Sequence, residues 1–197
     1  LGAVEGKSIL VTGAAGSIGS EIARQLSYYN VDQLILIDHA ESPLYDIEQE
    51  LIEKHISRKT VKPICEVANV KDRYRMNVIF DTYKPQLVFH AAAYKHVPII
   101  EKAPYEGIFV NVFGTRIVAD LSIEYGVEKF VMVSTDKAVN PTNVMGATKR
   151  VAELYTQSLN EFGKTKFIAT RFGNVLGSNG SVVPLFRKQI EAGGPLT

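Results

Sequence analysis

The stretch Gly13-Ala14-Ala15-Gly16-Ser17-Ile18-Gly19 decides the fold. It follows the apolar run Ser8–Thr12 directly and leads into a segment with helical spacing of apolar residues. Glycines at these three positions permit a tight turn, close approach of a diphosphate to the backbone, and close packing of the helix on the strand. A strand, a turn of the form G-x-x-G-x-x-G and a helix in this order indicate a dinucleotide-binding unit; a purely structural glycine turn is the alternative.

Apolar runs alternate with longer segments of helical period along the whole chain. We predict six strands, at Ser8–Thr12, Gln33–Asp38, Val61–Glu66, Gln86–Ala91, Lys129–Ser134 and Lys166–Arg171. Each is a near-continuous apolar run, as expected when helices cover both faces of a parallel sheet. The sequence therefore predicts an α/β fold, a Rossmann-type doubly wound parallel sheet.

Two of the helices expected between these strands have specific signals. The first has one apolar stripe, made by Ile18, Ile22, Ala23 and Leu26. For the second, Ser42 followed by Pro43 is typical of an N-cap with proline at the first helical position, so we expect a helix from there towards His55. Near the end of the chain, residues 178–181 predict a turn before a last helical segment.

Composition restricts the class of protein. With 46% hydrophobic residues, 22% charged residues and a net charge of +1, the 197-residue chain resembles ordinary globular proteins, which argues against a nucleic-acid partner. Cys65 is the only cysteine, so no internal disulfide can form, and a reducing cytoplasmic location fits best. No apolar run approaches the roughly 18 residues of a membrane span, so we expect no membrane contact for this chain. No metal is expected, because metal-ligand spacing is lacking among His39, His55, His90 and His96.

The length is that of one domain. We expect residues 1–197 to form one NAD(P)-binding domain, with the beginning of a substrate-binding region at about 174–197. Thr197 follows Gly193-Gly194-Pro195 with no closing strand or helix, so we expect a longer parent protein and a substrate lobe that is largely missing from this chain.

Residues at the ends of the predicted strands are candidates for holding the dinucleotide. From the glycine-rich stretch they are Gly13, Ala15, Gly16, Ser17, Ile18 and Gly19. Asp38 ends the second strand, where its carboxylate can accept hydrogen bonds from ribose hydroxyls and would repel a 2′-phosphate, so NAD is favoured over NADP. His39 is part of the same expected site. A helix-capping or solvated aspartate is the alternative.

Two more strand ends contribute candidates. Asn69 and Val70 follow the third strand and are placed to contact adenine, although an ordinary turn asparagine is an equal alternative. Ala91, Ala92 and Ala93 follow the fourth strand, where small side chains allow the dinucleotide backbone to approach. Small residues at strand ends are also common for packing, and the two interpretations are compatible.

Five segments together carry a specific resemblance to a known family. They are Val11–Gly19, His90–Pro98, Asn111–Thr115, Ser134–Pro141 and Arg171–Gly177. On these segments the chain resembles the extended short-chain dehydrogenase/reductases, and within them the nucleotide-sugar 4,6-dehydratases and epimerases of capsular polysaccharide biosynthesis. The resemblance covers nearly the whole chain.

The chain departs from the superfamily pattern at one chemically important position. Most members have Tyr-x-x-x-Lys, in which the tyrosine removes a hydroxyl proton, but the matching residues here are Met145 and Lys149. A thioether cannot carry a proton. The capsule-type dehydratases include members with methionine at this place, so the departure restricts the assignment to this subfamily. The alternative is that Met145 is a core methionine in an inactive enzyme. By resemblance, Lys149 binds the nicotinamide ribose.

Acid and base must then come from elsewhere. Thr135, Asp136 and Lys137 follow a strand end and match the family's dehydratase motif, although an adjacent aspartate and lysine on a loop would ordinarily be a solvated pair. By resemblance, Lys95, Asn174 and Ser181 are candidate contacts to the sugar or its diphosphate, with surface or turn roles as alternatives.

The resemblance implies an enzyme with NAD as its cofactor and a UDP-sugar as its substrate, acting as a UDP-N-acetylglucosamine 4,6-dehydratase. A nucleotide-sugar 4-epimerase and a non-catalytic NAD-binding regulatory module are the alternatives. It also implies a homo-oligomer in the full-length protein, whose membrane helices upstream would leave this domain facing the cytoplasm.

Overall fold

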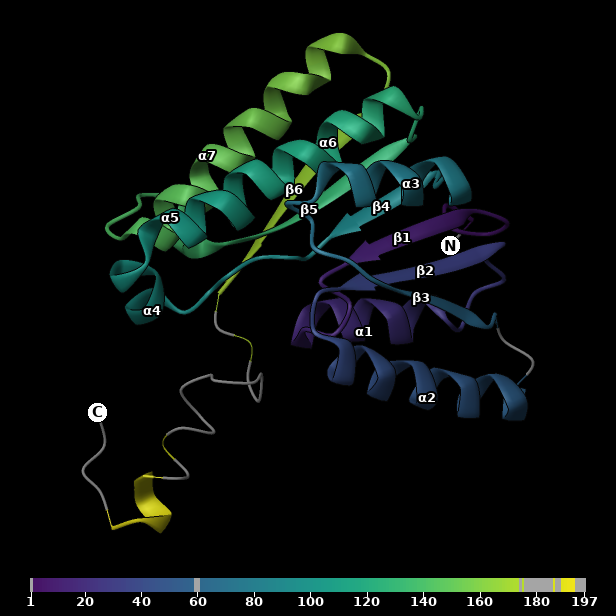
Figure 1. Ribbon diagram of the computed structural model, residues 1–197, viewed down its shortest axis with the longest axis horizontal. Helices are drawn as coiled ribbons and strands as arrows, with labels where there is room; N and C mark the ends of the chain where they lie inside the picture. The colour runs from purple at the N-terminus through teal and green to yellow at the C-terminus, as the bar shows by residue number, and fades with distance from the viewer. Residues whose placement is uncertain (1, 59–60, 174, 176–185, 187–188, 194–197) are drawn as a thin grey trace.

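Six parallel strands form the centre of the molecule (Figure 1). The computed structural model describes residues 2–58, 61–173, 175, 186 and 189–193. The strands are β1 (Ser8–Thr12), β2 (Gln33–Asp38), β3 (Pro63–Val67), β4 (Leu87–His90), β5 (Lys129–Thr135) and β6 (Lys166–Phe172). Their order across the sheet is β3-β2-β1-β4-β5-β6. The order reverses between β1 and β4, so the loops after these strands diverge and leave a crevice at the carboxyl ends.

The predicted doubly wound sheet is confirmed, and all six strands form where the apolar runs predict them. β1 and β2 have the predicted bounds. β3 begins two residues later than predicted and ends one later, β4 loses one residue at each end, and β5 and β6 each extend by one. These differences lie at strand ends, where apolar patterning carries the least information.

Helices cover both faces of the sheet (Figure 1). On one face lie α1 (Ser17–Leu26) and α2 (Glu41–Arg58). On the other lie α3 (Arg73–Tyr83), α6 (Thr115–Glu124) and α7 (Val144–Ser158). Shorter elements connect them, namely α4 (Val97–Lys102), α5 (Pro104–Gly107), a π-helical segment η1 (Ile108–Gly114), and the 3₁₀ turns η2 (Asp136–Ala138) and η3 (Leu159–Phe162).

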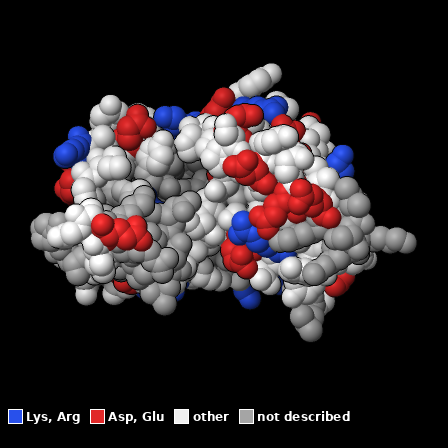
Figure 2. All heavy atoms as spheres, turned by 90° about the horizontal axis from the view of Figure 1, so that it is seen from below, with Lys and Arg blue, Asp and Glu red and all other residues white. Residues whose placement is uncertain are grey.

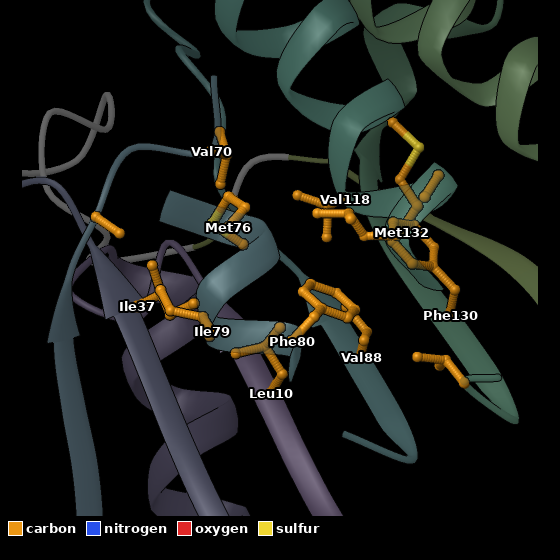
Figure 3. Packing of buried hydrophobic residues seen from close by; sticks show 14 of the residues in the cluster. Leu10, Ile37, Val70, Met76, Ile79, Phe80, Val88, Val118, Phe130 and Met132 are labelled. Carbon is orange, nitrogen blue, oxygen red and sulfur yellow. The ribbon is translucent and has the colours of Figure 1, made fainter. Parts of the chain in front are cut away.

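The alternation of side chains along each strand divides the core into two layers. Ile9 and Val11 of β1 pack towards α1 and α2, whereas Leu10 between them packs on the opposite face. Figure 3 shows this second layer, in which side chains from the sheet meet those of α3 and α6. Its labelled members include Leu10, Ile37, Val88, Phe130 and Met132 from the strands and Met76, Ile79, Phe80 and Val118 from the helices. Burial on both faces explains why the strands are continuous apolar runs.

The prediction that Ser42 caps the second helix is wrong. α2 begins at Glu41, and Leu44 N already donates to Ala40 O. The Ser42 hydroxyl instead donates to the Glu41 carboxylate. Pro43 therefore lies within the first turn, where its missing N–H leaves no helical hydrogen bond unmade.

The apolar stripe predicted for α1 is partly confirmed. Ala23 and Leu26 are buried and Ile22 packs partly against the core, but Ile18 lines a cavity at the crevice. The outer side of α2 is acidic, and Arg24 of α1 donates to Glu50 of α2 at 2.9 Å. Figure 2 shows carboxylate groups gathered over this helix with basic side chains among them. Within the described ranges, no helix combines the length and apolarity needed to cross a bilayer.

Candidate active site

The glycine turn between β1 and α1 forms one wall of the crevice. Gly13 has φ +68°, and a Cβ there would lie 2.5 Å from the backbone nitrogen of Ala92. A Cβ at Gly19 would lie 2.0 Å from the carbonyl oxygen of Gly13. Only glycine fits at either position, so the turn packs directly on the loop after β4. Gly16 precedes α1 without a side-chain cap, and the N-terminus of a helix is a favourable place for an anion.

Two adjoining cavities lie along this crevice, one of about 250 Å³ and one of about 680 Å³. Both are lined by Gly13, Gly16, Ala91, Ala93 and Tyr94. The first cavity also brings together Ala15, Asp38, His39, Asn69, Val70 and Ala92. The second also brings together Ser17, Ile18, Gly19, Lys95, Thr135, Lys137, Met145 and Lys149. Every residue proposed for the cofactor therefore lines one cavity or the other.

Asp38 is held in place at the wall of the first cavity. Its carboxylate accepts hydrogen bonds from the backbone N–H groups of Ala15 and Ala40, each at 3.0 Å, and His39 Nδ1 lies 3.3 Å away. The side chain is 8% exposed. Because each carboxylate oxygen can accept more than one hydrogen bond, the carboxylate can still receive hydroxyl donors from a ligand.

Asn69 forms a turn and also lies at the wall of the first cavity. Its side-chain oxygen accepts from Lys71 N at 3.1 Å, as a turn asparagine does, and the residue also lines the first cavity. Val70 beside it is buried against Gly114, where an added Cβ would lie 2.7 Å from the Val70 side chain.

Lys149 and Met145 lie one helical turn apart on α7 and both line the second cavity. Lys149 is 4% exposed, and its Nζ donates to Val133 O at 2.7 Å. Burial lowers the pKa of Lys149 to about 8, although the neighbouring carboxylate of Glu153 opposes this change. Glu153 is itself held by Arg171, whose Nε donates to it at 2.9 Å. Met145 is 3% exposed.

The Thr135, Asp136 and Lys137 side chains interact with one another at the end of β5. Thr135 Oγ1 donates to Asp136 Oδ1 at 2.9 Å, and Lys137 Nζ donates to the same oxygen at 3.2 Å. The hydrogen bond from Thr135 and then that from Lys137 lower the pKa of Asp136. Thr135 and Lys137 line the second cavity, whereas the Asp136 side chain is 55% exposed.

This arrangement favours the charged form of Asp136. Its carboxylate is too exposed for desolvation to dominate, and two donors stabilise the charged form instead. Any step that needs a protonated Asp136 must therefore first deliver a proton to it.

Sequence reasoning missed the contacts that hold this turn in place. Gly146 lies on α7 against the turn, because a Cβ there would be 2.4 Å from the carbonyl oxygen of Lys137. Asn143 caps the helix by accepting from Gly146 N at 2.8 Å, and Glu101 of α4 accepts from Val144 N at 2.7 Å. The asparagine before a helical segment was a usable capping signal, but the contact with Glu101 has no local signal.

A buried polar network behind the crevice was also missed. His90 lies between Thr12 and Thr115, whose hydroxyl oxygens are 2.8 Å from Nδ1 and 2.9 Å from Nε2. Thr115 donates its hydrogen to Asn111 O, so it must accept from Nε2–H of His90. Burial, with a smaller effect from Lys149, lowers the pKa of His90 to about 3, and the ring is therefore neutral.

Asn111, on the π-helical segment η1, extends this network to the site. Its amide group both accepts from Tyr94 N at 2.8 Å and donates to Tyr94 O at 3.0 Å. It also donates to Thr148 Oγ1 on α7 at 3.0 Å. Asn111 thereby ties the loop after β4 to the helix that holds Lys149.

Of the three predicted substrate contacts, Lys95 lines the second cavity. Asn174 and Ser181 lie outside the described residues, as do the predicted turn at 178–181 and most of the region at 174–197. Tyr94, His96 and Glu106 line the second cavity but were not predicted. Tyr94 and His96 follow β4 beside the crevice, and this position was the available signal. Glu106 lies on α5 and had no such signal. Among the described residues, no group of three His, Cys, Asp or Glu residues is placed to hold a metal ion.

Comparison with known proteins establishes the family. A family profile described as "Polysaccharide biosynthesis protein" matches residues 9–197. The chain belongs to this family. Similar proteins include the capsular polysaccharide biosynthesis protein CapD of Staphylococcus aureus, which is 55% identical over 97% of this chain and 32% of that protein. The resemblance to the extended short-chain dehydrogenase/reductases of capsule biosynthesis is thus confirmed.

Two more distant relatives have named activities. A UDP-N-acetylglucosamine 4,6-dehydratase (inverting) of Campylobacter jejuni is 38% identical over 95% of this chain and 55% of that enzyme. A UDP-glucose 4-epimerase of Rickettsia canadensis is 36% identical over 97% of this chain and 55% of that enzyme. The chain thus spans from about a third to about half of the length of these relatives.

Solved structures agree with the fold of this family member. The structure of Pen from Bacillus thuringiensis has a TM-score of 0.87 and 30% identity, covering 97% of this chain and 58% of that one. The UDP-glucose 4-epimerase of Thermus thermophilus in complex with NAD has a TM-score of 0.76 and 24% identity, covering 95% and 64%.

Proposed function

We propose that the full-length protein is an NAD-dependent 4,6-dehydratase of a UDP-sugar, UDP-N-acetylglucosamine, in polysaccharide biosynthesis. One observation carries the proposal: Thr135 and Lys137 share a cavity with Lys149, and this cavity adjoins the one that contains Asp38. A bound dinucleotide that extends between the cavities would place its reactive end beside the Thr135–Lys137 turn.

The described residues fit NAD at three places. The turn at Gly13 and Gly19 leaves no room for side chains where a diphosphate would approach, and α1 begins at this turn without a side-chain cap, so its positive dipole end faces the same place. Asp38 is positioned to accept the ribose hydroxyls of the adenosine half. Lys149 is positioned to bind the nicotinamide ribose. NAD, when bound, supplies a reversible hydride acceptor.

The chain's own side chains would carry the proton transfers. Lys137, as a neutral amine, takes the proton from C5 and later returns it there. Asp136, once protonated, gives its proton to the departing C6 hydroxyl, which leaves as water. Thr135 forms a hydrogen bond to the oxygen at C4. Positioned acids and bases of this kind contribute roughly 10²–10⁴-fold each.

The 38% identity with a named UDP-N-acetylglucosamine 4,6-dehydratase supports this substrate. The 36% identity with a named UDP-glucose 4-epimerase is the observation in support of a second candidate function, that of a nucleotide-sugar 4-epimerase. Met145 argues against epimerisation, because that reaction normally relies on a tyrosine at this position and a thioether cannot exchange a proton.

The test is product analysis with the full-length protein, NAD and candidate UDP-sugars, by mass spectrometry and NMR. We expect a 4-keto-6-deoxy product that has lost one water. Asp136→Asn and Lys137→Ala should each slow its formation by roughly 10²–10⁴-fold while NAD affinity changes little.

Matched controls are Asp81→Asn, in an exposed ion pair, and Lys166→Ala, at the opposite end of the sheet from the site. Both should keep wild-type rates. An epimerised product without loss of water would select the epimerase, and NAD binding without any turnover would select the regulatory module.

A further inference from the structure

The buried position of Lys149 disfavours its charged form. The residue is 4% exposed, and burial lowers its pKa to about 8. Met145, one turn before it, offers only a thioether, which is neither charged nor a hydrogen-bond donor. A positive nicotinamide ring in the same cavity disfavours the ammonium form further. A carboxylate close to Lys149 must offset these effects if an ammonium group is to bind the nicotinamide ribose.

The ionisable groups that face Lys149 across the second cavity supply little of this negative charge. Among the described residues they are Tyr94, Lys95, His96, Glu106 and Lys137. Glu106, the carboxylate of this set, lies 3.5 Å from the ammonium group of Lys71. Asp136 accepts from Lys137 at 3.2 Å, and the buried ring of His90 is neutral. The compensating charge must therefore come from behind the cavity wall.

Glu153 lies behind this wall, one helical turn after Lys149. It is the only acidic residue among the 15 residues of α7, and its side chain is 0% exposed. Residues four positions apart on a helix have Cβ atoms about 5–6 Å apart. At such a separation an opposite charge favours the ionised form of a neighbour, and the Glu153 carboxylate does raise the pKa of Lys149 against the larger effect of burial.

Two arginines keep Glu153 ionised in its buried position. Burial alone would raise the pKa of Glu153, but hydrogen bonds, first of all from Arg171, lower it to about 2. The Arg171 Nε and Nη2 atoms donate to the two carboxylate oxygens at 2.9 and 2.6 Å. Arg150 Nη1 adds a third contact at 3.2 Å. A two-point contact between a guanidinium group and a carboxylate fixes the orientation of both.

These contacts join α7 to two neighbouring strands. Lys149 Nζ donates to Val133 O of β5 at 2.7 Å, whereas Glu153 accepts from Arg171 of β6. β5 and β6 pair in parallel along this part of the sheet. Phe172, directly after Arg171, lines the second cavity. Consecutive turns of α7 are thus attached to adjacent strands at the wall of the site.

From this geometry we propose that Glu153 is a positioning residue for Lys149: anchored by Arg171, it keeps the ammonium group charged and within reach of the nicotinamide ribose. The inference rests on the role proposed above for Lys149 in binding that ribose. An ammonium group has three donors, so two remain for ribose hydroxyls after the bond to Val133 O. Glu153 lines neither cavity and acts only through Lys149.

The test compares two variants that break the same ion pair but change the charge in opposite directions. Glu153→Gln removes a negative charge and keeps the shape, whereas Arg171→Met removes a positive charge and leaves Glu153 paired with Arg150. The pH dependence of the reaction of Lys149 with acetic anhydride, followed by mass spectrometry of its peptide, gives its pKa in the full-length protein without cofactor. We expect this pKa to fall by about 1–3 units in Glu153→Gln and to stay or rise in Arg171→Met. The matched control is Glu124→Gln, which removes an arginine-paired carboxylate from α6 and should leave it unchanged.

Calorimetry of NAD binding gives a second readout. Because the affinity should follow the fraction of Lys149 that is charged, a pKa lower by about two units should weaken NAD binding about tenfold at pH 7 but only about twofold at pH 6. A purely structural role of Glu153 would weaken binding by the same factor at both pH values. Recovery at the lower pH therefore distinguishes the effect of charge from damage to the helix.

Three outcomes would overturn the proposal: an unchanged Lys149 pKa in Glu153→Gln, a fall in Arg171→Met as large as that in Glu153→Gln, and equal weakening of NAD binding at pH 6 and 7. If Glu153→Gln alone does not fold, the double variant with Arg171→Met removes the cation left unpaired. Its Lys149 pKa should lie about 1–3 units below that of Arg171→Met alone, and equal values would overturn the proposal. Neither measurement uses a sugar, so failure of the proposed function, in which the wild-type protein dehydrates no UDP-sugar, is seen separately.

Discussion

Replacing Gly146 with alanine should damage the site although it favours the helix. Alanine is better than glycine inside a helix by roughly 1 kcal/mol, so α7 itself would gain stability. The added Cβ, however, would lie 2.4 Å from the carbonyl oxygen of Lys137, well inside normal contact distance. Carbon atoms in contact are about 3.5–4.0 Å apart, so the turn and the helix must separate by about 1 Å. A displacement of this size can cost about 10²-fold in rate.

The assay is the rate of formation of the dehydrated product by the full-length protein, with NAD affinity measured by calorimetry. We expect Gly146→Ala to lower kcat about 10²-fold and to change NAD affinity less than tenfold, because the cavity of Asp38 is not touched. Gly2→Ala is the control, since an added Cβ there has no neighbour within 4 Å. Wild-type kcat in Gly146→Ala would refute the reasoning, because it would show that the turn does not depend on its contact with α7.

Three further predictions concern the cofactor and Lys149. NAD should bind at least tenfold more tightly than NADP, about 1.4 kcal/mol, because Asp38 would repel a 2′-phosphate; equal affinities by calorimetry would contradict this. Met145→Leu should keep most of the activity and Lys149→Ala should lose most of it through poor cofactor placement; loss of turnover in Met145→Leu with folding and NAD binding intact would reveal an unassigned chemical role. Between pH 8 and 10.5 the unfolded chain holds a proton that folded Lys149 lacks, so the free energy of unfolding should rise with pH by about 3 kcal/mol across this window. Urea unfolding should show this rise in wild type but not in Lys149→Met.

The sequence was sufficient to predict the sheet because burial on both faces leaves a strong pattern. Each strand is a run of apolar residues, and the glycine turn after β1 marks where the chain changes direction. Helix starts were harder to predict, as α2 illustrates. Ser42 and Pro43 form a valid capping pattern, but the Asp38 carboxylate accepts from Ala40 N and so fixes the start of the helix earlier. The contact between Asp38 and Ala40 forms only because β2 ends at Asp38, so the capping pattern at Ser42 could not reveal it.

For the site, the positions of residues along the chain predicted which of them would line the crevice, but the sequence could not predict their protonation states. Residues at strand ends meet in one crevice because parallel strands share their carboxyl edge, which is why Asp38 and Thr135 were predictable as members of the site. The charge state of Asp136 depends on which donors reach its two oxygens. An adjacent aspartate and lysine can form an exposed ion pair or a buried neutral pair, and the amino-acid sequence is the same in both cases.

The segment Asn111–Thr115 is one of the five that carry the family resemblance, and it supports the crevice from behind. None of its residues lines either cavity. Asn111 instead holds the loop at Tyr94 against Thr148, and Thr115 satisfies His90 behind the glycine turn. A buried polar group without its partner costs roughly 1–3 kcal/mol, so these residues depend on one another. The motif therefore sets the distance between the glycine wall of the crevice and the helix of Lys149, which is the distance that a cofactor lying between them must match.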